Sequence, residues 1–353
     1  MSKKFKIGLF GINSNSGIAM TKVKNRWEAK WEDIKTVVEI CDKSEIDFIF
    51  SVQRWLGFDG ATNPAGLTYD SLSFSSALAS ISKKIEIYAT LHVPLIHPTF
   101  AARALSTIDQ ISNGRVALNI VCGWNEKEFN MFGIKNNKYI DRYKQGEEWL
   151  KVLNKILDKK EFSPFKGKYF NIKYSTSSPK LFKRKKLNIT SAAFSDKGRL
   201  FAAKNCDQLI TMFSNLTSAK KQIQSIKRKS KVFGRKIKVL GLAHVVCRKS
   251  NKEAEEYYNF YAAKMADKKA IDNFIGILNN NKKNNVFSNL QKMQIKKMAG
   301  GIGSYPLIGS PKKIIEEIYE FKKIGLDGFA ISFVNYKDEL PYFINSVIRK
   351  LNL

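Results

Sequence analysis

The stretch TFAARALSTIDQISNGRVALNIVCGW (residues 99–124) joins a helix pattern to a strand pattern through a short turn. The apolar residues of 99–112 fall on one helical face, and Asn113-Gly114 directly after them is a typical helix stop. The next run, VALNIVCG (116–123), is apolar almost throughout, as expected of a buried strand. A helix that leads within a few residues into a buried strand is typical of a parallel α/β sheet.

The same alternation continues along the chain. Strand-like runs occupy residues 5–12, 47–52, 85–93, 116–123, 187–193, 207–213, 238–247 and 328–334. Helical patterns between them include 31–44, 99–112, 142–157 and 310–325, the last with Ser310 as N-cap, Pro311 in the first turn and Gly325 as C-cap. Eight strands alternating with helices predict a parallel sheet, and eight is the number that closes a (β/α)8 TIM barrel.

Two connections are unusually long, so we expect insertions after the fourth and seventh strands. Residues 158–186 contain EFSPFKGKYFNIKYSTSSP, which indicates a small hairpin or an extended excursion. Residues 251–309 contain NNNKKNN, a loop tip, and the glycine-rich MAGGIGSYPLIG. Loops of this length are usually lids or binding loops, and we expect the lid in 280–306. Without an internal repeat or a linker, residues 1–353 are expected to form a single domain.

Composition narrows the class of protein. The 353 residues are 44% hydrophobic, enough for a sizeable core, and contain no apolar run of the roughly 18 residues that a membrane helix needs. The N-terminal MSKKFKIGLFGI resembles a first strand more than a signal peptide, which favours the cytoplasm. Four cysteines without C-x-x-C spacing and three histidines make a metal site unexpected.

The formal net charge of +30 leaves three interpretations open. Dispersed lysines favour solvated helix faces, but an anionic ligand or partner, or a nucleic acid, would also suit a basic chain. The densest basic runs are KRKK (183–186) and KRKSK (227–231). Because no known nucleic-acid motif and no membrane span is present, neither a nucleic-acid nor a membrane partner is predicted.

If the chain is a barrel, its site lies at the carboxyl ends of the strands. Those ends are Gly11-Ile12-Asn13, Ser51-Val52-Gln53-Arg54, His92, Asn119 to Trp124, Ala192 to Ser195, Met212-Phe213, His244 and Phe333-Val334. They combine apolar, aromatic and uncharged polar groups with few acids. Such a site suits a flat, uncharged ring better than a sugar or a metal cluster.

Four stretches of the sequence resemble those of a known protein family. They are HPTFAARALSTIDQISNGRVALNIVCGWNEKEFNMFGI (97–134), the R-Y-x-x-x-x-E that begins at Arg142, FKGKYFNI (165–172) and LIGSPKKIIEEI (307–318). The chain resembles the bacterial-luciferase-like flavin monooxygenases, in particular the two-component branch of dimethylsulfone, alkanesulfonate and pyrimidine-ring monooxygenases. The resemblance implies a barrel, reduced FMN (FMNH2) supplied by a separate NAD(P)H-dependent flavin reductase, and O2. It also implies oxygen transfer through a flavin 4a-hydroperoxide, and a homo-oligomer.

Carried over position by position, the resemblance assigns cofactor contacts to strand ends and helix starts. The expected FMN-binding residues are Gln53, Arg54, Asn119, Glu128, Arg142, Tyr143 and Ser195. The last three belong to the phosphate side, which is consistent with the affinity of helix N-termini for anions. His244 and Asn119 are the expected catalytic residues, because histidine can hold or donate a proton near neutral pH.

Three departures from the family pattern bear on cofactor and substrate. The phosphate loop reads Ala193-Phe194-Ser195, where relatives often have Gly-Gly-Ser or Gly-Gln-Ser, and this puts the phosphate geometry in doubt. Leu242 stands where the alkanesulfonate branch has an arginine, and GGIGSYPLIG (300–309) lacks the arginine of that branch's mobile loop. A desolvated sulfonate without a paired cation is costly. We therefore expect a small neutral substrate, an organosulfur compound such as a sulfone first and a cyclic amide such as a pyrimidine second, with an alkanesulfonate as a further alternative.

Structural alternatives exist for the same residues. Asn119 could be satisfied by neighbouring backbone, Glu128 could be a solvated helix charge, and His244 could be a core histidine. Other functions also remain possible. The same fold binds deazaflavin in enzymes that transfer hydride without O2. A binding protein is the second alternative: a degenerate barrel could hold flavin without turnover, or a basic surface could bind nucleic acid.

Overall fold

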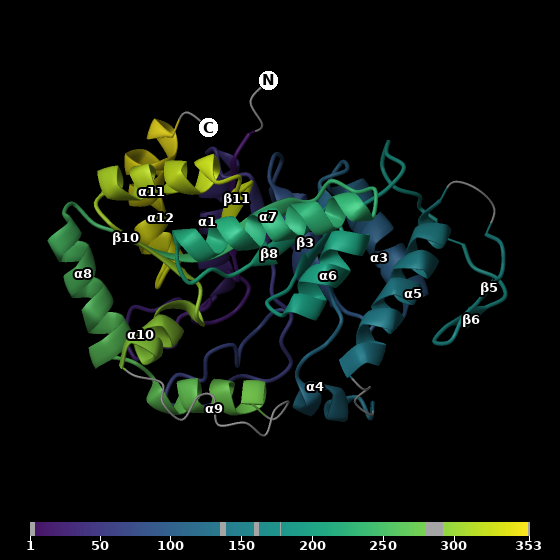
Figure 1. The fold of residues 1–353 in the computed structure, drawn as a ribbon, viewed down its shortest axis with the longest axis horizontal. Helices are drawn as coiled ribbons and strands as arrows, with labels where there is room; N and C mark the ends of the chain where they lie inside the picture. The colour runs from purple at the N-terminus through teal and green to yellow at the C-terminus, as the bar shows by residue number, and fades with distance from the viewer. Residues whose placement is uncertain (1–3, 135–138, 159–161, 177, 280–291, 352–353) are drawn as a thin grey trace. The chain divides into compact units, whose positions relative to one another are not determined.

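The computed structural model describes residues 4–134, 139–158, 162–176, 178–279 and 292–351 (Figure 1). The chain forms two compact units. The first is built from residues 1–69, 211–224 and 239–353, and the second from 70–210 and 225–238. Within the described residues, no helix is both long and apolar enough to cross a bilayer.

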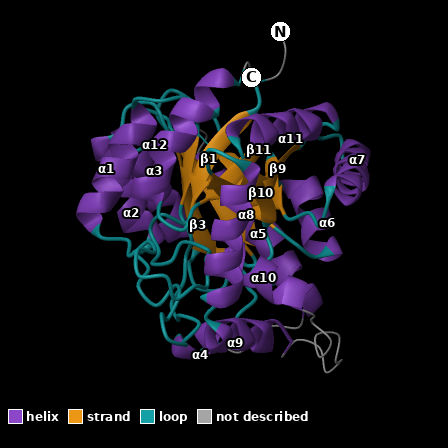
Figure 2. Cartoon of the chain, turned by 90° about the vertical axis from the view of Figure 1, so that its left-hand side faces the viewer, coloured by secondary structure: helices purple, strands orange, loops and turns teal. Residues whose placement is uncertain are grey.

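The first unit holds five parallel strands, and four of them, β1, β9, β10 and β11, are labelled in Figure 2. In sheet order they are β10 (Tyr305–Gly309), β9 (Lys238–Cys247), β11 (Gly328–Ser332), β1 (Lys6–Phe10) and β2 (Phe48–Phe50). Its helices are α1 (Trp31–Asp42), α8 (Asn251–Asn259), the π-helix η1 (Phe260–Lys264), α9 (Lys268–Asn279), α10 (Lys292–Gly301), α11 (Pro311–Lys323), α12 (Tyr336–Ser346) and the 3-10 helix η2 (Ile348–Lys350).

The second unit holds four parallel strands in the order β3 (Glu86–His92), β4 (Val116–Val121), β7 (Asn188–Ala192) and β8 (Gln208–Thr211). Its helices are α2 (Ser71–Ile81), α3 (Pro98–Ile111), α4 (Glu126–Met131), α5 (Tyr139–Leu157) and α6 (Asp196–Asn205). Helix α7 (Leu216–Val232) contributes its second half. A small antiparallel hairpin of β5 (Phe165–Lys166) and β6 (Asn171–Ile172) follows α5.

All eight predicted strands are present, and each pairing described among them is parallel. Both predicted insertions are also confirmed. The first contains the β5–β6 hairpin, and the second contains α8 to α10 followed by β10, a strand that the sequence did not predict. Of the expected lid, residues 292–301 form α10, while NNNKKNN falls almost entirely outside the described residues.

Helix ends follow the residues that predicted them. Helix α3 starts at Pro98, with His97 as N-cap accepting the Thr99 N–H at 3.2 Å, and Asn113 and Gly114 after it take positive φ values of 54° and 84°. Helix α11 begins at Pro311 behind the Ser310 cap. The predicted stop at Asn113-Gly114 is confirmed, because Asn and Gly tolerate the left-handed backbone that ends a helix. Gly325, predicted as the C-cap of α11, instead follows the C-cap Ile324 and takes a φ of 92°.

Each unit buries a tryptophan whose indole N–H is satisfied by a backbone carbonyl. Trp27 in the first unit donates to Ile12 O at 2.8 Å, and Trp149 in the second donates to Ile96 O at 2.7 Å. Both side chains are almost fully buried. A large apolar surface thus enters each core without leaving an unpaired donor.

Glu148 is the acid of the R-Y-x-x-x-x-E pattern, and its contacts are with the β5–β6 hairpin. Its carboxylate accepts the backbone N–H groups of Lys168 (3.0 Å), Tyr169 (2.8 Å) and Phe170 (2.7 Å). A Cβ on Gly167 would lie 2.1 Å from Glu148 Oε1, so the glycine allows the carboxylate to approach this turn closely. FKGKYF and Glu148 therefore form one structural clamp between α5 and the hairpin.

We expect Glu148→Ala to lower the free energy of unfolding by about 1.5–3 kcal/mol, the range for hydrogen bonds to a charged group. The hairpin should also become the first site of cleavage in limited proteolysis. Glu147→Ala is the matched control, because Glu147 contacts Lys204 rather than the hairpin. Identical urea midpoints and cleavage patterns for the two variants would contradict the clamp.

Candidate functional site

The junction between β4 and α4 is a close approach that requires glycine. Gly123 has a positive φ of 96°, and a Cβ there would lie 2.3 Å from Cζ of Phe129, which is buried beneath the turn. The carbonyl of Gly123 accepts a hydrogen bond from Arg142 Nη1 at 2.6 Å. The turn after β4 is thereby joined to the first part of α5.

Arg142 and Tyr143 lie beside the start of α6. The guanidinium carbon of Arg142 is 5.3 Å from the Tyr143 ring centroid, a distance typical of a cation–π contact. The Tyr143 hydroxyl is 3.3 Å from Ser195 Oγ, and its ring packs against Phe201 of α6. Three predicted phosphate-side residues are thus brought together between α5 and α6, which are neighbours in Figure 1.

The first turn of α6 is closely packed and is capped by its own serine. Ser195 is the N-cap and accepts the Gly198 N–H at 3.2 Å. A Cβ at Gly198 would lie 3.0 Å from Tyr143 Oη and 2.9 Å from Ala193 Cβ, so the glycine lets both residues approach this turn closely. Free N–H groups and the positive end of the helix dipole favour an anion at such a position.

Phe194 does not crowd this turn. Its side chain is 44% exposed, and its carbonyl accepts a hydrogen bond from Arg199 Nη1 at 2.8 Å. The phenylalanine that put the phosphate geometry in doubt therefore directs much of its ring toward solvent.

Asn119 is satisfied by protein on both sides of its amide. Its Nδ2 donates to Thr90 Oγ1 at 3.1 Å, and its Oδ1 accepts the Ala192 N–H at 3.0 Å. From the middle strand β4, this side chain therefore bonds both neighbouring strands, β3 and β7. The structural alternative for Asn119 is supported, and its contact with a cofactor or reacting group stays a prediction.

Glu128 and Gln53 are buried polar residues close to strand ends. Glu128 in α4 is 1% exposed, which excludes the interpretation as a solvated helix charge. Gln53, after β2, is 8% exposed. The neighbouring Arg54 donates to Leu56 O at 3.1 Å and lies 4.8 Å from the Phe58 ring centroid.

His244 is enclosed in the first unit by α10, α8 and the start of β10. Its Nδ1 is 2.9 Å from Ser304 Oγ, and its ring lies 5.4 Å from that of Tyr258. A Cβ on Gly300 would be 2.9 Å from Nε2, and one on Gly301 would be 2.7 Å from Nδ1. The glycine pair of α10 thus lies directly on the imidazole, and Nε2 has no hydrogen-bond partner among the described residues.

This environment determines the charge of His244. Burial, followed by the positive charges of Lys297 and Lys296, lowers its pKa to about 3. The ring is therefore neutral near pH 7, and in this conformation proton exchange near neutral pH is not available to it. Its predicted catalytic role would require α10 to uncover Nε2, and that role remains a prediction.

The predicted residues divide between the two units. Asn119, Glu128, Arg142, Tyr143 and Ser195 belong to the second unit, while Gln53, Arg54 and His244 belong to the first. The sequence reasoning did not single out Gly198, Ser304 or Tyr258. Gly198, three residues after a serine that opens a helix, carried a usable signal, whereas nothing in the sequence linked Ser304 and Tyr258 to His244.

A comparison with known families identifies the class. Residues 50–328 match the model of the luciferase-like monooxygenase family, which spans parts of both units and most of the chain. The chain therefore belongs to the luciferase-like monooxygenases. The resemblance inferred from residues 97–143 is confirmed.

Individual relatives cover almost the whole chain. It is 27% identical to an FMNH2-dependent dimethylsulfone monooxygenase of Pseudomonas putida, over 99% of this chain and 95% of the relative. It is 26% identical to the pyrimidine monooxygenase RutA of Acinetobacter baylyi, over 94% and 90%. The crystal structure of DmoA from Hyphomicrobium sulfonivorans superposes with a TM-score of 0.86 at 18% identity, covering 99% of this chain and 88% of that one. The likeness confirms the predicted (β/α)8 fold.

Proposed function

We propose that this chain is a monooxygenase that uses reduced FMN and O2 to insert one oxygen atom into a small neutral substrate. An organosulfur compound such as a sulfone is the first candidate, and a cyclic amide such as a pyrimidine is the second. Family membership and the FMNH2-dependent relative support the enzyme class and the cofactor. A dimethylsulfone enzyme and a pyrimidine enzyme among the relatives support the two substrate candidates.

The second unit has groups suited to the phosphate of FMN. A phosphate dianion there would meet the cation of Arg142, the hydroxyl donors of Tyr143 and Ser195, and backbone N–H groups at the amino end of α6. Gln53, Arg54, Asn119 and Glu128 would contact the rest of the cofactor. When bound, reduced FMN supplies the electrons that activate O2. The protein's part is to orient the cofactor, exclude water and hold the substrate.

The substrate class rests mainly on Leu242. It is fully buried, two residues before His244 on β9, where the alkanesulfonate branch has an arginine. The glycine-rich segment 300–309 forms the end of α10 and β10 and also lacks arginine. A leucine at this position cannot neutralise a sulfonate, so a neutral ligand fits better.

Four further expectations are part of this proposal. A separate NAD(P)H-dependent flavin reductase delivers the reduced FMN, the two units act as one luciferase-like domain over 1–353, the enzyme is a homo-oligomer, and it works in the cytoplasm. Turnover that requires an added flavin reductase would support the first expectation. The molar mass of the enzyme in solution, measured by light scattering, would test the third.

The decisive test is turnover with a flavin reductase, NADH, FMN and a panel of sulfones, pyrimidines, alkanesulfonates and alkanes under labelled O2. Mass spectra should show one labelled oxygen in a sulfone or pyrimidine product and none under anaerobic conditions. Sulfite release from alkanesulfonates alone would overturn the neutral-substrate assignment. Anaerobic turnover with reduced deazaflavin would replace the oxygenase by a hydride-transfer enzyme.

Arg142→Ala should weaken binding of reduced FMN by about 1.5–3 kcal/mol, because a charge-assisted hydrogen bond to the phosphate is lost. Anaerobic fluorescence titration would measure the change. Arg103→Ala removes an exposed arginine of α3 and should leave the affinity unaltered. Because Arg142 also bonds Gly123 O, thermal melting must show that the variant is folded. A folded Arg142→Ala variant with wild-type affinity would rule out this placement of the phosphate.

A further inference from the structure

A lysine of KRKK and an arginine from the turn after KRKSK meet at one carboxylate. Asp207 Oδ1 is 3.2 Å from Lys186 Nζ, the last residue of KRKK (183–186), and 3.1 Å from Arg235 Nη2, just after KRKSK (227–231). Its Oδ2 accepts the Ile189 N–H at 3.0 Å, which fixes the carboxylate to β7. Segments about 45 residues apart in sequence therefore form one surface, which we call the basic tip (residues 183–186 and 227–236).

The basic tip lies at the amino ends of the strands. Residues 183–186 lead into β7, Asp207 stands directly before β8, and residues 233–237 lead into β9. The phosphate-side residues Arg142, Tyr143 and Ser195, in contrast, follow the carboxyl ends of β4 and β7. Residues of the basic tip are therefore not part of the proposed FMN site, and the proposed function does not explain them.

The charge of the basic tip is strongly one-sided. Its two ranges contain lysines and arginines and no acidic residue. Two of its arginines are held by protein carboxylates, Arg184 by buried Asp109 and Arg235 by Asp207. The exposed cations are mainly lysines, among them Lys183, Lys185, Lys231 and Lys236.

An apolar pair stands among these cations. Val232 is 79% exposed and Phe233 is 41% exposed, at the carboxyl end of α7. The turn that presents them is held by backbone hydrogen bonds from Phe233 N and Arg235 N to Ser230 O and from Gly234 N to Lys231 O. Gly234 takes a φ of 66°, which suits this turn. The two side chains are therefore displayed by an ordered turn.

We propose that the basic tip docks on a bilayer surface that carries anionic lipid headgroups. Lysines placed near such a surface are attracted to its negative potential, and an exposed apolar pair between them can enter the interfacial region. Nucleic acid fits less well. Of the apolar pair only Phe233 has an aromatic face to stack on a base, and two of the three arginines that could bind phosphates are already engaged by carboxylates. The sequence predicted no membrane partner because no span is present, but surface docking needs no span.

Vesicle sedimentation with the full chain tests the proposal. Wild type should bind phosphatidylcholine vesicles that contain phosphatidylserine and not pure phosphatidylcholine, and raised salt should weaken the binding. Lys231→Gln/Lys236→Gln should weaken it about 25-fold, at roughly 1 kcal/mol for each lysine near the surface. Val232→Ser/Phe233→Ser should weaken it about tenfold, through lost apolar burial.

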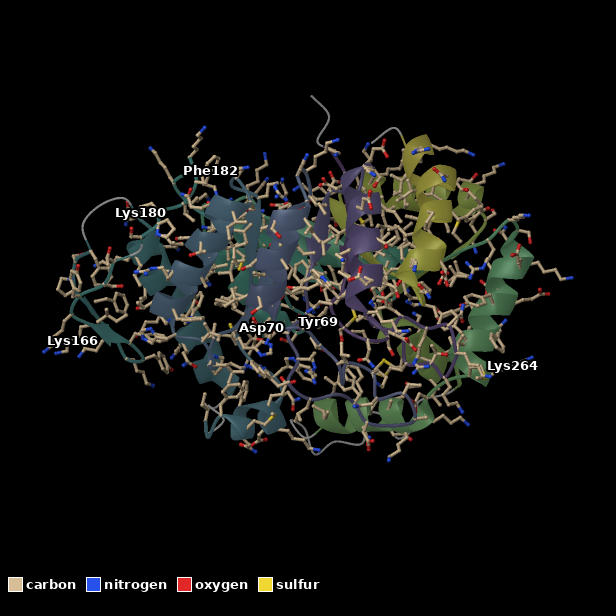
Figure 3. The ribbon with its side chains drawn as sticks, turned by 180° about the vertical axis from the view of Figure 1, so that it is seen from behind. Tyr69, Asp70, Lys166, Lys180, Phe182 and Lys264 are labelled. Atoms are coloured by element: carbon tan, nitrogen blue, oxygen red, sulfur yellow. The ribbon has the colours of Figure 1, made fainter. Side chains whose placement is uncertain are left out.

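The matched control is Lys166→Gln/Lys173→Gln, which removes two exposed lysines of the same unit, one in β5 and one directly after β6. Lys166 lies well away from Lys180 and Phe182, which precede the basic tip (Figure 3). This control should bind anionic vesicles as wild type does. Melting temperatures of all variants should match, since the changed side chains are exposed.

Three results would overturn the proposal. Wild type could fail to sediment with anionic vesicles at low salt. The hairpin control could lose as much binding as the lysine variant, which would show dispersed charge rather than a docking surface. Duplex DNA could displace wild type from the vesicles, and DNA binding could be weakened by Lys231→Gln/Lys236→Gln but not by Val232→Ser/Phe233→Ser. That last result would make the basic tip a nucleic-acid surface.

Discussion

Asp109→Ala is expected to lower the free energy of unfolding by about 3–5 kcal/mol, the range for breaking a buried ion pair by removing one partner. Asp109 in α3 is fully buried. Its carboxylate forms an ion pair with Arg184 and accepts the Phe182 N–H at 2.8 Å. Alanine would leave the guanidinium without its counter-charge, bonded only to the carbonyl of Val116, and the Phe182 N–H without its acceptor. Urea unfolding followed by circular dichroism would measure the loss.

Glu39→Ala provides the comparison. It removes an ion pair with Lys43 at the exposed end of α1, where solvent screens the interaction. Its urea midpoint should equal that of wild type within error. In Asp109→Ala/Arg184→Ala the loss should be smaller than the sum of the two single losses, because the second change removes the stranded charge. Simple additivity would show that the two residues act independently.

The motif that identified the family is largely a structural one. In STIDQISNGR (106–115), Asp109 holds Arg184, and Arg115 donates to the carbonyls of Ala79, Ser82, Ile85 and Ser112. These bonds tie the end of α2, the end of α3 and the start of β3 together. The motif therefore specifies how helices meet strands, which explains why it predicted the fold well and the chemistry only through resemblance.

Elements with strong local signals were predictable, and those that depend on partners were not. Strand β10 was missed because YPLIG contains Pro306 and follows glycines, whereas prolines are rare within central strands. In the first unit β10 is the outermost strand and pairs with β9, so the missing N–H of Pro306 costs little. Helix α2 was missed because SLSFSSALASI combines serines with apolar residues and gives no clear amphipathic pattern.

The candidate site shows the same limit. Strand ends located Asn119 and His244, because parallel strands present their carboxyl ends at one edge. The sequence could not reveal that the amide of Asn119 is hydrogen-bonded to Thr90 and Ala192. Nor could it reveal that Ser304, sixty residues after His244, forms a hydrogen bond with the imidazole of that histidine. Long-range partners arise from the fold, and they decide whether a polar side chain remains available for chemistry.

His244 should make the protein less stable as the pH falls from about 6.5 toward 3. In the unfolded chain histidine has a pKa of about 6.5. In the folded chain burial, then Lys297 and Lys296, lowers the pKa to about 3. Between these values the unfolded state binds a proton that the folded state does not, so stability decreases with falling pH. Above 6.5 both states are neutral and the contribution is constant.

The expected size is about 2 kcal/mol between pH 6.5 and 4.5, since one pKa unit corresponds to about 1.4 kcal/mol. Carboxylates also titrate in this range, so the measured quantity is the difference in slope between wild type and His244→Gln, from urea unfolding at several pH values. His97→Gln is the comparison: burial also lowers the pKa of His97, at the start of α3, but by less than that of His244, so its slope should change in the same direction and by a smaller amount. A variant slope equal to that of wild type would mean that His244 is solvated or paired in solution. In that case α10 would not cover the imidazole, and proton exchange near neutral pH would again be open to it.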